Sequence, residues 1–151
     1  MTESAQTQYL AHHLRHIHAT SAKEHARYDR YFEKNLLRHL PAQRAARILD
    51  VGCGTGHFLH FLKQAGYANY AALDCCGDAL DLCVAHGLIG REQCHAEDAV
   101  TFFNRPQEPW DAVVMNDVIE HIEKAQIIGL LSAIRRALRP GGVLLVKTVN
   151  A

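Results

Sequence analysis

A glycine-rich segment between an apolar run and a helical stretch constrains this chain more than any other feature. Residues 48–56 read ILDVGCGTG, with glycine at alternate positions Gly52, Gly54 and Gly56. Glycine adopts positive φ and lets the backbone approach a bound molecule without a Cβ in the way. A dinucleotide fingerprint would need glycine where His57 stands, and a P-loop would need a Gly-Lys-Ser/Thr ending. We therefore interpret the segment as a ligand loop of another kind, with a plain tight turn as the alternative.

From Arg47 onward, short apolar runs are separated by helical stretches. This alternation is typical of βαβ units and predicts an α/β domain built on a parallel sheet. We expect strands at 47–51, 69–74, 92–95, 110–115 and 143–149. We expect helices at 55–65, 78–86 and 123–138, closed by Gly66, Gly87 and Pro140 in turn. The segment 99–104 is long enough for only one or two helical turns.

The beginning of the chain is polar and rich in histidine. Over residues 1–20 it predicts a loosely held leader or a marginal helix. His12 and His16 are spaced as i and i+4, which can hold a metal ion, but no third ligand accompanies them in a recognisable pattern. A solvated helix face is the preferred interpretation of this pair.

An aromatic stripe follows the leader. Tyr28, Phe32 and further apolar residues recur at helical spacing and predict a helix over 28–40 that Pro41 stops. Packing against the domain is the simplest role for such a stripe. We divide the chain accordingly into a helical leader at 1–40 and a single domain at 41–151.

Composition restricts the partners of the domain. The 151 residues carry 16 basic and 16 acidic side chains, so the formal net charge is zero, which removes the bulk electrostatic argument for a nucleic-acid partner. No apolar run approaches the roughly 18 residues of a membrane span, and the start MTESAQTQYL is not a signal peptide. Five cysteines without a C-x-x-C spacing favour reduced thiols over a disulfide framework or a zinc site. We expect a cytoplasmic protein without a membrane or nucleic-acid partner.

Five motifs, taken in order, resemble the class I S-adenosylmethionine-dependent methyltransferases. The first motif of that family is similar to ILDVGCGTGHFL at 48–59, and YAALD ending at Asp74 is similar to its second strand. Glu97 and Asp98 follow the third strand, WDAVVMNDVIEHI covers the fourth, and LRPGGVLLVKTVNA covers the fifth. The resemblance spans 47–151 and implies a Rossmann-like, doubly wound parallel sheet of strand order 3-2-1-4-5. It also implies S-adenosylmethionine as cofactor and S-adenosylhomocysteine as product, with the helix at 28–40 as a lid over the cofactor.

The resemblance assigns the cofactor contacts residue by residue. An acid at the end of the second strand accepts hydrogen bonds from the ribose diol, so Asp74 has that role, with a helix cap or a surface acid as the alternative. Asp98 accepts from the adenine amino group beside the N–H of Ala99, and Glu97 competes with it if the register differs by one residue. The set expected at the cofactor is Asp50, Gly52, Cys53, Gly54, Gly56, Asp74, Cys75, Asp98, Ala99, Asn116 and Asp117.

Within that set, the methionine end of the cofactor has its own partners. Asp50 and the carbonyl of Asn116 face the ammonium group, while the glycines approach the ligand backbone and sugar. Cys75 and Cys76 stand where the family often has small or apolar residues beside adenine, so they are expected to pack and not to act as nucleophiles.

The loop after the fourth strand carries the candidate catalytic group. Asp117, Glu120 and His121 resemble a D-x-x-E-H variant of the E-x-x-E-H arrangement that holds a divalent ion in some O-methyltransferases. Many family members use the Glu-His pair as a helix-start cap without metal, which is the favoured interpretation of the pair. His121 can instead take a proton from an acceptor hydroxyl, and we name it as the catalytic residue, with no metal site.

The acceptor is expected to be a small molecule methylated at oxygen. The motifs of base-directed enzymes, an N-P-P-Y tetrad or a Pro-Cys pair, are not present in the sequence. The alternative function is a noncatalytic cofactor-binding or interaction module that lacks its acceptor site. A nicotinamide dehydrogenase is disfavoured by His57.

The family fold usually continues after the fifth strand with a helix and a two-stranded hairpin. We expect this chain, which reaches Ala151, to be a fragment or a minimal form without that hairpin. The fifth strand would then present an apolar edge through which a homodimer can form.

Overall fold

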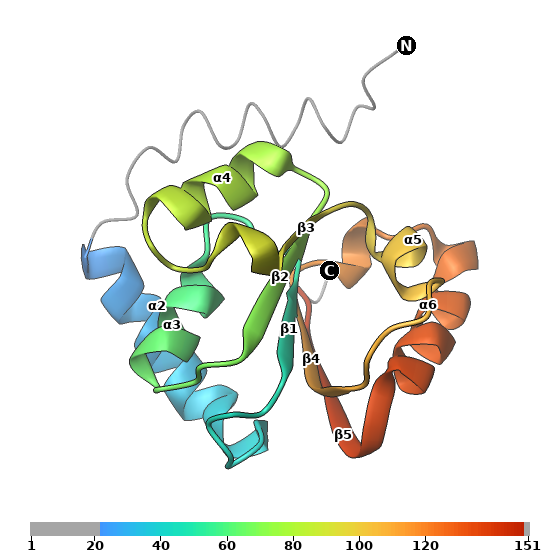
Figure 1. Ribbon diagram of the computed structural model, residues 1–151, viewed down its shortest axis with the longest axis horizontal. Coiled ribbons are helices and arrows are strands. Elements are labelled where there is room, and N and C mark those ends of the chain that lie inside the picture. The colour runs from blue at the N-terminus through green and yellow to red at the C-terminus, as the bar shows by residue number, and fades with distance from the viewer. Residues whose placement is uncertain (1–21, 150–151) are drawn as a thin grey trace.

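A single parallel sheet organises the computed structural model, which describes residues 22–149. Its five strands lie in the order β3-β2-β1-β4-β5, and helices cover both faces (Figure 1). This is the doubly wound order expected from the motifs, so the predicted fold class is confirmed. The expectations for residues 1–20, including the pair His12 and His16, lie outside the described residues.

The strands follow the apolar runs closely, except at the fifth. Strand β1 spans Ile48–Val51, β2 spans Tyr70–Asp74, β3 spans Cys94–Ala96, β4 spans Trp110–Asn116 and β5 spans Leu138–Lys147. β1 and β2 are buried along their whole length, which explains their continuous apolar sequence, since helices pack on both faces of a parallel sheet. β3 begins two residues late because a short 3-10 helix, Arg91–Gln93, occupies its expected start.

The start of β5 corrects the sequence prediction. Pro140 does not stop the preceding helix, which already ends at Ala137. Leu138 is extended and pairs with Trp110, and the next pair is Val143 with Ala112, so the intervening residues form an irregularity in the strand. The residue before a proline avoids the helical region, and Gly141 adopts a φ of 80°, which together favour a bulge here over a clean break.

The helices form two layers with separate cores. Helices α2 (Ala22–Asn35), α3 (His57–Gln64) and α4 (Gly77–Ala85) lie on one face, around buried residues such as Phe32, Phe58 and Ile48. Helices α5 (Ala99–Phe103) and α6 (Lys124–Ala137) cover the other, around Trp110 and Leu130 (Figure 1). No helix among residues 22–149 is long and apolar enough to cross a membrane.

The N-terminal helix differs from its prediction. The α-helix ends at Asn35 and not at residue 40, because the Asn35 side chain donates to the carbonyl oxygen of Tyr31 at 2.7 Å and the chain then tightens into the 3-10 helix Leu37–His39. Leu40 is extended, as the residue before Pro41 must be. The aromatic stripe packs as expected: the rings of Phe32 and Phe58 meet edge to face at 5.1 Å.

Candidate active site

The glycine loop connects β1 to α3, and each of its three glycines has a positive φ. A Cβ on Gly52 would lie 2.4 Å from the Val118 side chain, and a Cβ on Gly56 would lie 2.6 Å from Leu88. Gly54, at φ 50°, faces open space within 4 Å. Protein side chains therefore make the close approach at Gly52 and Gly56, whereas Gly54 has open space on its Cβ side. The expected approach of a ligand to the glycines stays a prediction.

Asp74 fastens this loop to the end of β2. One carboxylate oxygen accepts the N–H of Gly54 at 2.9 Å, and the other accepts the N–H of Cys76 at 2.8 Å. The side chain is only 6% exposed. Burial raises its pKa, and the hydrogen bonds from Cys76 and Gly54 oppose that rise. Asp74 is not a helix cap, since the N-cap of α4 is Cys76, and each carboxylate oxygen retains a second lone pair for a ligand.

Buried polar atoms without partners mark the ends of β1 and β4. Asp50 is 1% exposed, one of its carboxylate oxygens has no hydrogen-bond partner, and burial raises its pKa well above the usual range. Both side-chain amide atoms of Asn116 are likewise buried and unpartnered. Asp50 pairs in register with Val114, so Asn116, two residues further along β4, lies on the same face of the sheet. An unpaired buried polar group is costly, so a ligand that supplied the missing partners would bind favourably at this place.

Asp117 follows Asn116 with a φ of 55°, the one left-handed backbone at a non-glycine residue in the described chain. Its N–H donates to the carbonyl oxygen of Lys147 at 2.8 Å. The ammonium of Lys147 pairs with one oxygen of Asp117, and the other oxygen is buried without a partner. Such strain is held only where surrounding contacts enforce it, and it is common at functional sites.

After the carboxyl end of β3, the two competing acids Glu97 and Asp98 make different contacts. Glu97 pairs with Arg105. Asp98 is the N-cap of α5, where its side chain accepts the N–H of Thr101 at 2.9 Å and its pKa is lowered by that hydrogen bonding. Ala99 is the first residue of α5. The N–H groups in the first turn of a helix have no hydrogen-bond acceptor within the helix, so they are free to bind another group. Asp98 and Ala99 thus stand together at the carboxyl end of β3.

All five cysteines are free thiols, as the composition predicts. Cys53 and Cys83 are buried, and the thiol of Cys83 donates to the carbonyl oxygen of Gly54 at 3.4 Å. Cys76 is buried and packs as expected, whereas Cys75 is exposed, and its expected place beside adenine stays a prediction. Its sulfur is nevertheless partly desolvated, which raises the pKa of the Cys75 thiol and disfavours the thiolate that a nucleophile needs.

The loop after β4 does not adopt the favoured capping role. Glu120 and His121 belong to a separate 3-10 helix, Ile119–His121, whereas α6 begins after Glu123 and has no side-chain cap. Glu120 accepts a hydrogen bond from the Thr148 hydroxyl at 3.1 Å. The cap interpretation fails because two residues separate His121 from α6, and Glu120 contacts Thr148 instead. Among residues 22–149, no three His, Cys, Asp or Glu side chains are grouped so that they could hold a metal ion.

The model of the methyltransferase domain family matches residues 8–151. This chain belongs to the methyltransferase domain family. The class I resemblance indicated by the motifs is confirmed.

Curated relatives of the methyltransferase domain are longer proteins. This chain is 33% identical over 107 residues to a ubiquinone biosynthesis O-methyltransferase of Xylella fastidiosa strain 9a5c, and the match covers 70% of this chain and 42% of the relative. It is 32% identical over 133 residues to a malonyl-[acyl-carrier protein] O-methyltransferase of Pectobacterium atrosepticum, covering 81% of this chain and 48% of the relative. The chain thus spans less than half the length of either relative.

A solved structure supports the fold of the methyltransferase domain. The S-adenosylmethionine-dependent methyltransferase of Archaeoglobus fulgidus superposes with a TM-score of 0.69 at 20% identity, covering 83% of this chain and 53% of that one. At this identity the likeness concerns the fold alone.

Three contacts of the methyltransferase domain, at the carboxyl ends of β4 and β5, were not predicted from the sequence. Lys147 contacts Asp117, Thr148 contacts Glu120, and the ring of Tyr31 lies 6.0 Å from the Lys147 ammonium. No short-range spacing links these residues. The only available signal was the polar sequence that follows the last apolar run, at the same edge as the loop after β4.

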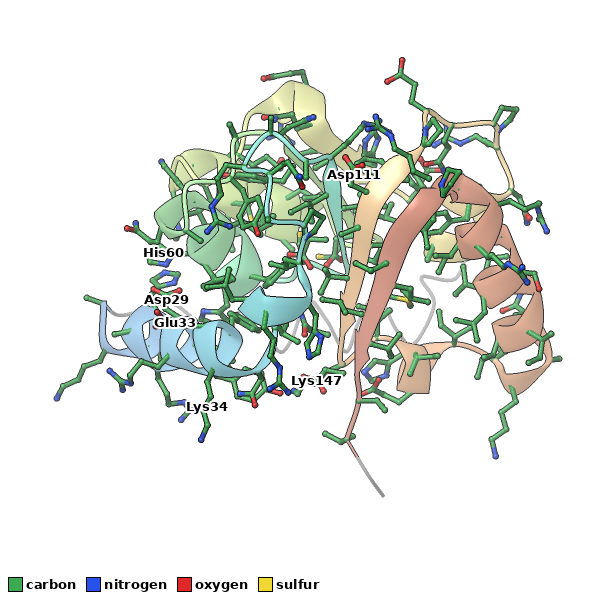
Figure 2. The ribbon with its side chains drawn as sticks, turned by 90° about the horizontal axis from the view of Figure 1, so that it is seen from below. Asp29, Glu33, Lys34, His60, Asp111 and Lys147 are labelled. Carbon is green, nitrogen blue, oxygen red and sulfur yellow. The ribbon has the colours of Figure 1, made fainter. Side chains whose placement is uncertain are left out.

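Histidine side chains pack between α2 and α3, the helix that follows the glycine loop. The rings of His25 and His60 stack at 4.1 Å, those of Tyr28 and His57 stack at 4.0 Å, and His60 lies 3.1 Å from the carboxylate of Asp29. Figure 2 shows His60 and Asp29 facing each other between the two helices. One ring nitrogen in each of His25 and His57 is buried without a partner, and burial lowers the pKa of both side chains.

These lowered pKa values predict loss of stability in mild acid. The unfolded chain takes up protons at His25 and His57 near the ordinary pKa of about 6.5, whereas the folded chain does so only at lower pH. The contribution of the pair to stability is therefore full above about pH 6.5 and is lost as the pH falls through the lowered pKa values. Melting temperatures at about pH 7.5 and about 5.5 should show this loss, and it should shrink in the double variant His25→Phe, His57→Phe. Equal losses in both proteins would contradict the assignment.

Proposed function

We propose that this domain binds S-adenosylmethionine at the carboxyl ends of its strands and transfers the methyl group to an oxygen atom of a small-molecule acceptor. The observation that carries the proposal is the set of buried, unpartnered polar atoms at the ends of β1 and β4, beside a glycine loop with one open side. Family membership supports the same function. In open α/β sheets, ligands bind at this edge.

The donor set fits the amino-acid end of the cofactor. The free oxygen of Asp50 and the side-chain oxygen of Asn116 can accept N–H groups of an ammonium, and the Asn116 amide can donate to a carboxylate. Burial of the Asp50 carboxyl favours its protonated form until a cation arrives, so cation binding and loss of that proton are coupled. When bound, S-adenosylmethionine supplies an electrophilic methyl group on a sulfonium cation.

The remaining contacts follow the strand ends toward β3. Asp74 accepts from the ribose hydroxyls with its unused lone pairs, while it continues to hold the glycine loop. Gly54 leaves room for the sugar. Asp98 accepts from the adenine amino group, and the N–H of Ala99 donates to the ring. Gly52, Gly56 and Cys53 contribute by shaping the loop.

Two of the relatives are named as O-methyltransferases, which supports transfer to oxygen. The acceptor hydroxyl loses a proton as its oxygen bonds to the methyl carbon and the carbon–sulfur bond breaks. We assign His121 as the group that takes this proton, because it lies on the loop directly after β4. The expected cytoplasmic location and the expected lack of a nucleic-acid partner stay predictions.

The proposed activity is tested by transfer of label from methyl-labelled S-adenosylmethionine into fractionated cell extract. Labelled product that requires the intact Asp74 side chain supports the enzyme. Tight binding of S-adenosylhomocysteine without product from any fraction favours the alternative, a noncatalytic binding module. Absence of binding overturns both.

We expect His121→Ala to lower methyl transfer about tenfold while S-adenosylhomocysteine affinity stays unchanged. The effect is smaller than for a buried base, because His121 is exposed and water can replace it, and because positioning supplies much of the rate. Initial rates and calorimetric titration measure the two quantities. A rate unchanged by the substitution would remove His121 from the mechanism.

The expected homodimer also remains a proposal. β5 lies at an edge of the sheet, with Val146 41% exposed and Val149 just beyond it 62% exposed. An apolar edge strand can pair with a second copy. Sedimentation velocity at increasing concentration should detect a dimer that Val146→Lys weakens, and a concentration-independent monomer would contradict it.

A further inference from the structure

Lys147 holds Asp117 through two independent links at the carboxyl ends of β4 and β5. Its carbonyl oxygen accepts the N–H of Asp117 at 2.8 Å, and its ammonium pairs with one oxygen of the Asp117 carboxylate. The centre of the Tyr31 ring on α2 lies 6.0 Å from the same ammonium. Lys147 also pairs in register with Asn116. The Lys147 side chain is therefore fixed from the sheet and from α2 together.

This arrangement divides the Asp117 carboxylate into a used and an unused oxygen. Lys147 takes one, while the other is buried and has no hydrogen-bond partner. A freely rotating surface carboxylate would expose both oxygens to water. The buried oxygen belongs to the residue that directly follows Asn116, whose amide is also unpartnered, and its desolvation is compensated only when a donor arrives.

The charges indicate which donor fits. Three accepting oxygens without partners, from Asp50, Asn116 and Asp117, lie at the ends of the neighbouring strands β1 and β4. A primary ammonium has three N–H donors and no acceptor. Once the Asp50 carboxyl has lost its proton, two carboxylates stand against the single cation of Lys147, and this net negative charge favours a cationic group over an anionic one.

We infer that Lys147 is a positioning residue that turns the free oxygen of Asp117 toward the ammonium of the cofactor's amino-acid moiety. The inference rests on the proposed function and extends it to a residue outside the recognised motifs. A merely structural ion pair at this partly exposed place contributes little to stability and has no reason to act on ligand affinity.

Two probes separate these roles. S-adenosylhomocysteine carries the amino-acid moiety, and 5′-methylthioadenosine lacks it. Calorimetric titration should show that Lys147→Met weakens S-adenosylhomocysteine about tenfold and leaves 5′-methylthioadenosine within about twofold, the scale of one charge-assisted hydrogen bond. Lys147→Arg should restore most of the affinity. Because Lys147 acts through Asp117, adding Lys147→Met to Asp117→Asn should cause little further loss.

The fold offers a matched control. Arg139 on β5 pairs with Asp111 on β4 at 3.1 Å, which joins the same two strands at the opposite end of the sheet (Figure 2). Arg139→Met should leave the affinity for both probes unchanged. Equal weakening of both probes by Lys147→Met, or additive losses in the double variant, would overturn the inference while leaving the cofactor site intact. If the wild-type protein binds neither probe, the proposed function fails and the inference fails with it.

Discussion

Asp74→Ala is expected to reduce S-adenosylhomocysteine affinity about 100-fold and to destabilise the fold by about 3 kcal/mol. The affinity falls because the ribose loses a charged acceptor for both hydroxyls, each hydrogen bond to a charged group contributing about 1.5 kcal/mol or more. Stability falls because the buried N–H groups of Gly54 and Cys76 lose their acceptor. Calorimetric titration and denaturant unfolding measure the two effects.

A nearby acid serves as the control for this substitution. Asp78, in the first turn of α4, is exposed, so Asp78→Ala should leave affinity unchanged and alter stability only slightly. Asp74→Asn keeps the shape and one accepting oxygen, and it should lie between wild type and Asp74→Ala. Wild-type affinity in a folded Asp74→Ala protein would remove the residue from the ribose site.

The glycine loop supplies the second large prediction, as a matched pair. Gly54→Val should weaken cofactor binding about 100-fold with a modest loss of stability, because its Cβ meets no protein atom within 4 Å and would occupy the open side. Gly56→Val should instead destabilise the fold by about 3 kcal/mol, because its Cβ meets Leu88 at 2.6 Å and Cys83 at 2.9 Å.

Thermal melts with and without S-adenosylhomocysteine distinguish the two members of the pair. The wild-type protein should show a ligand-induced rise in melting temperature, Gly54→Val should lose that rise, and Gly56→Val should melt at a lower temperature without ligand. A Gly54→Val protein that keeps the full rise would show that no ligand approaches this glycine.

The strands of the sheet could be predicted because each is specified by a short, continuous stretch of sequence. Strands such as β1 and β2 are continuous apolar runs bounded by glycine or polar residues, and a parallel sheet buried on both faces needs that sequence. The start of β5 was not predictable, because the sequence around Pro140 is compatible with both a helix stop and a bulge. Pairing of Leu138 with Trp110, distant in sequence, decides between them.

The candidate site likewise combines residues that local motifs indicate with contacts that only the folded sheet creates. Asp50, Asp74 and Asp98 could be named as candidates from the sequence because each has a fixed place relative to a strand end. The contact between Lys147 and Asp117 spans 30 residues and exists only once β5 lies beside β4. The capping role for Glu120 and His121 was a local expectation, and it failed because the short 3-10 helix ends before α6 begins.

The left-handed backbone at Asp117 restricts how this position can vary over evolution. Outside glycine, only aspartate and asparagine enter that conformation without a large steric cost, because their short polar side chains can bond locally. Of these three, glycine offers no acceptor and asparagine no charge for Lys147. Homologous chains that keep a lysine at position 147 should therefore keep aspartate at 117, whereas chains that replace the lysine are free to carry asparagine or glycine there.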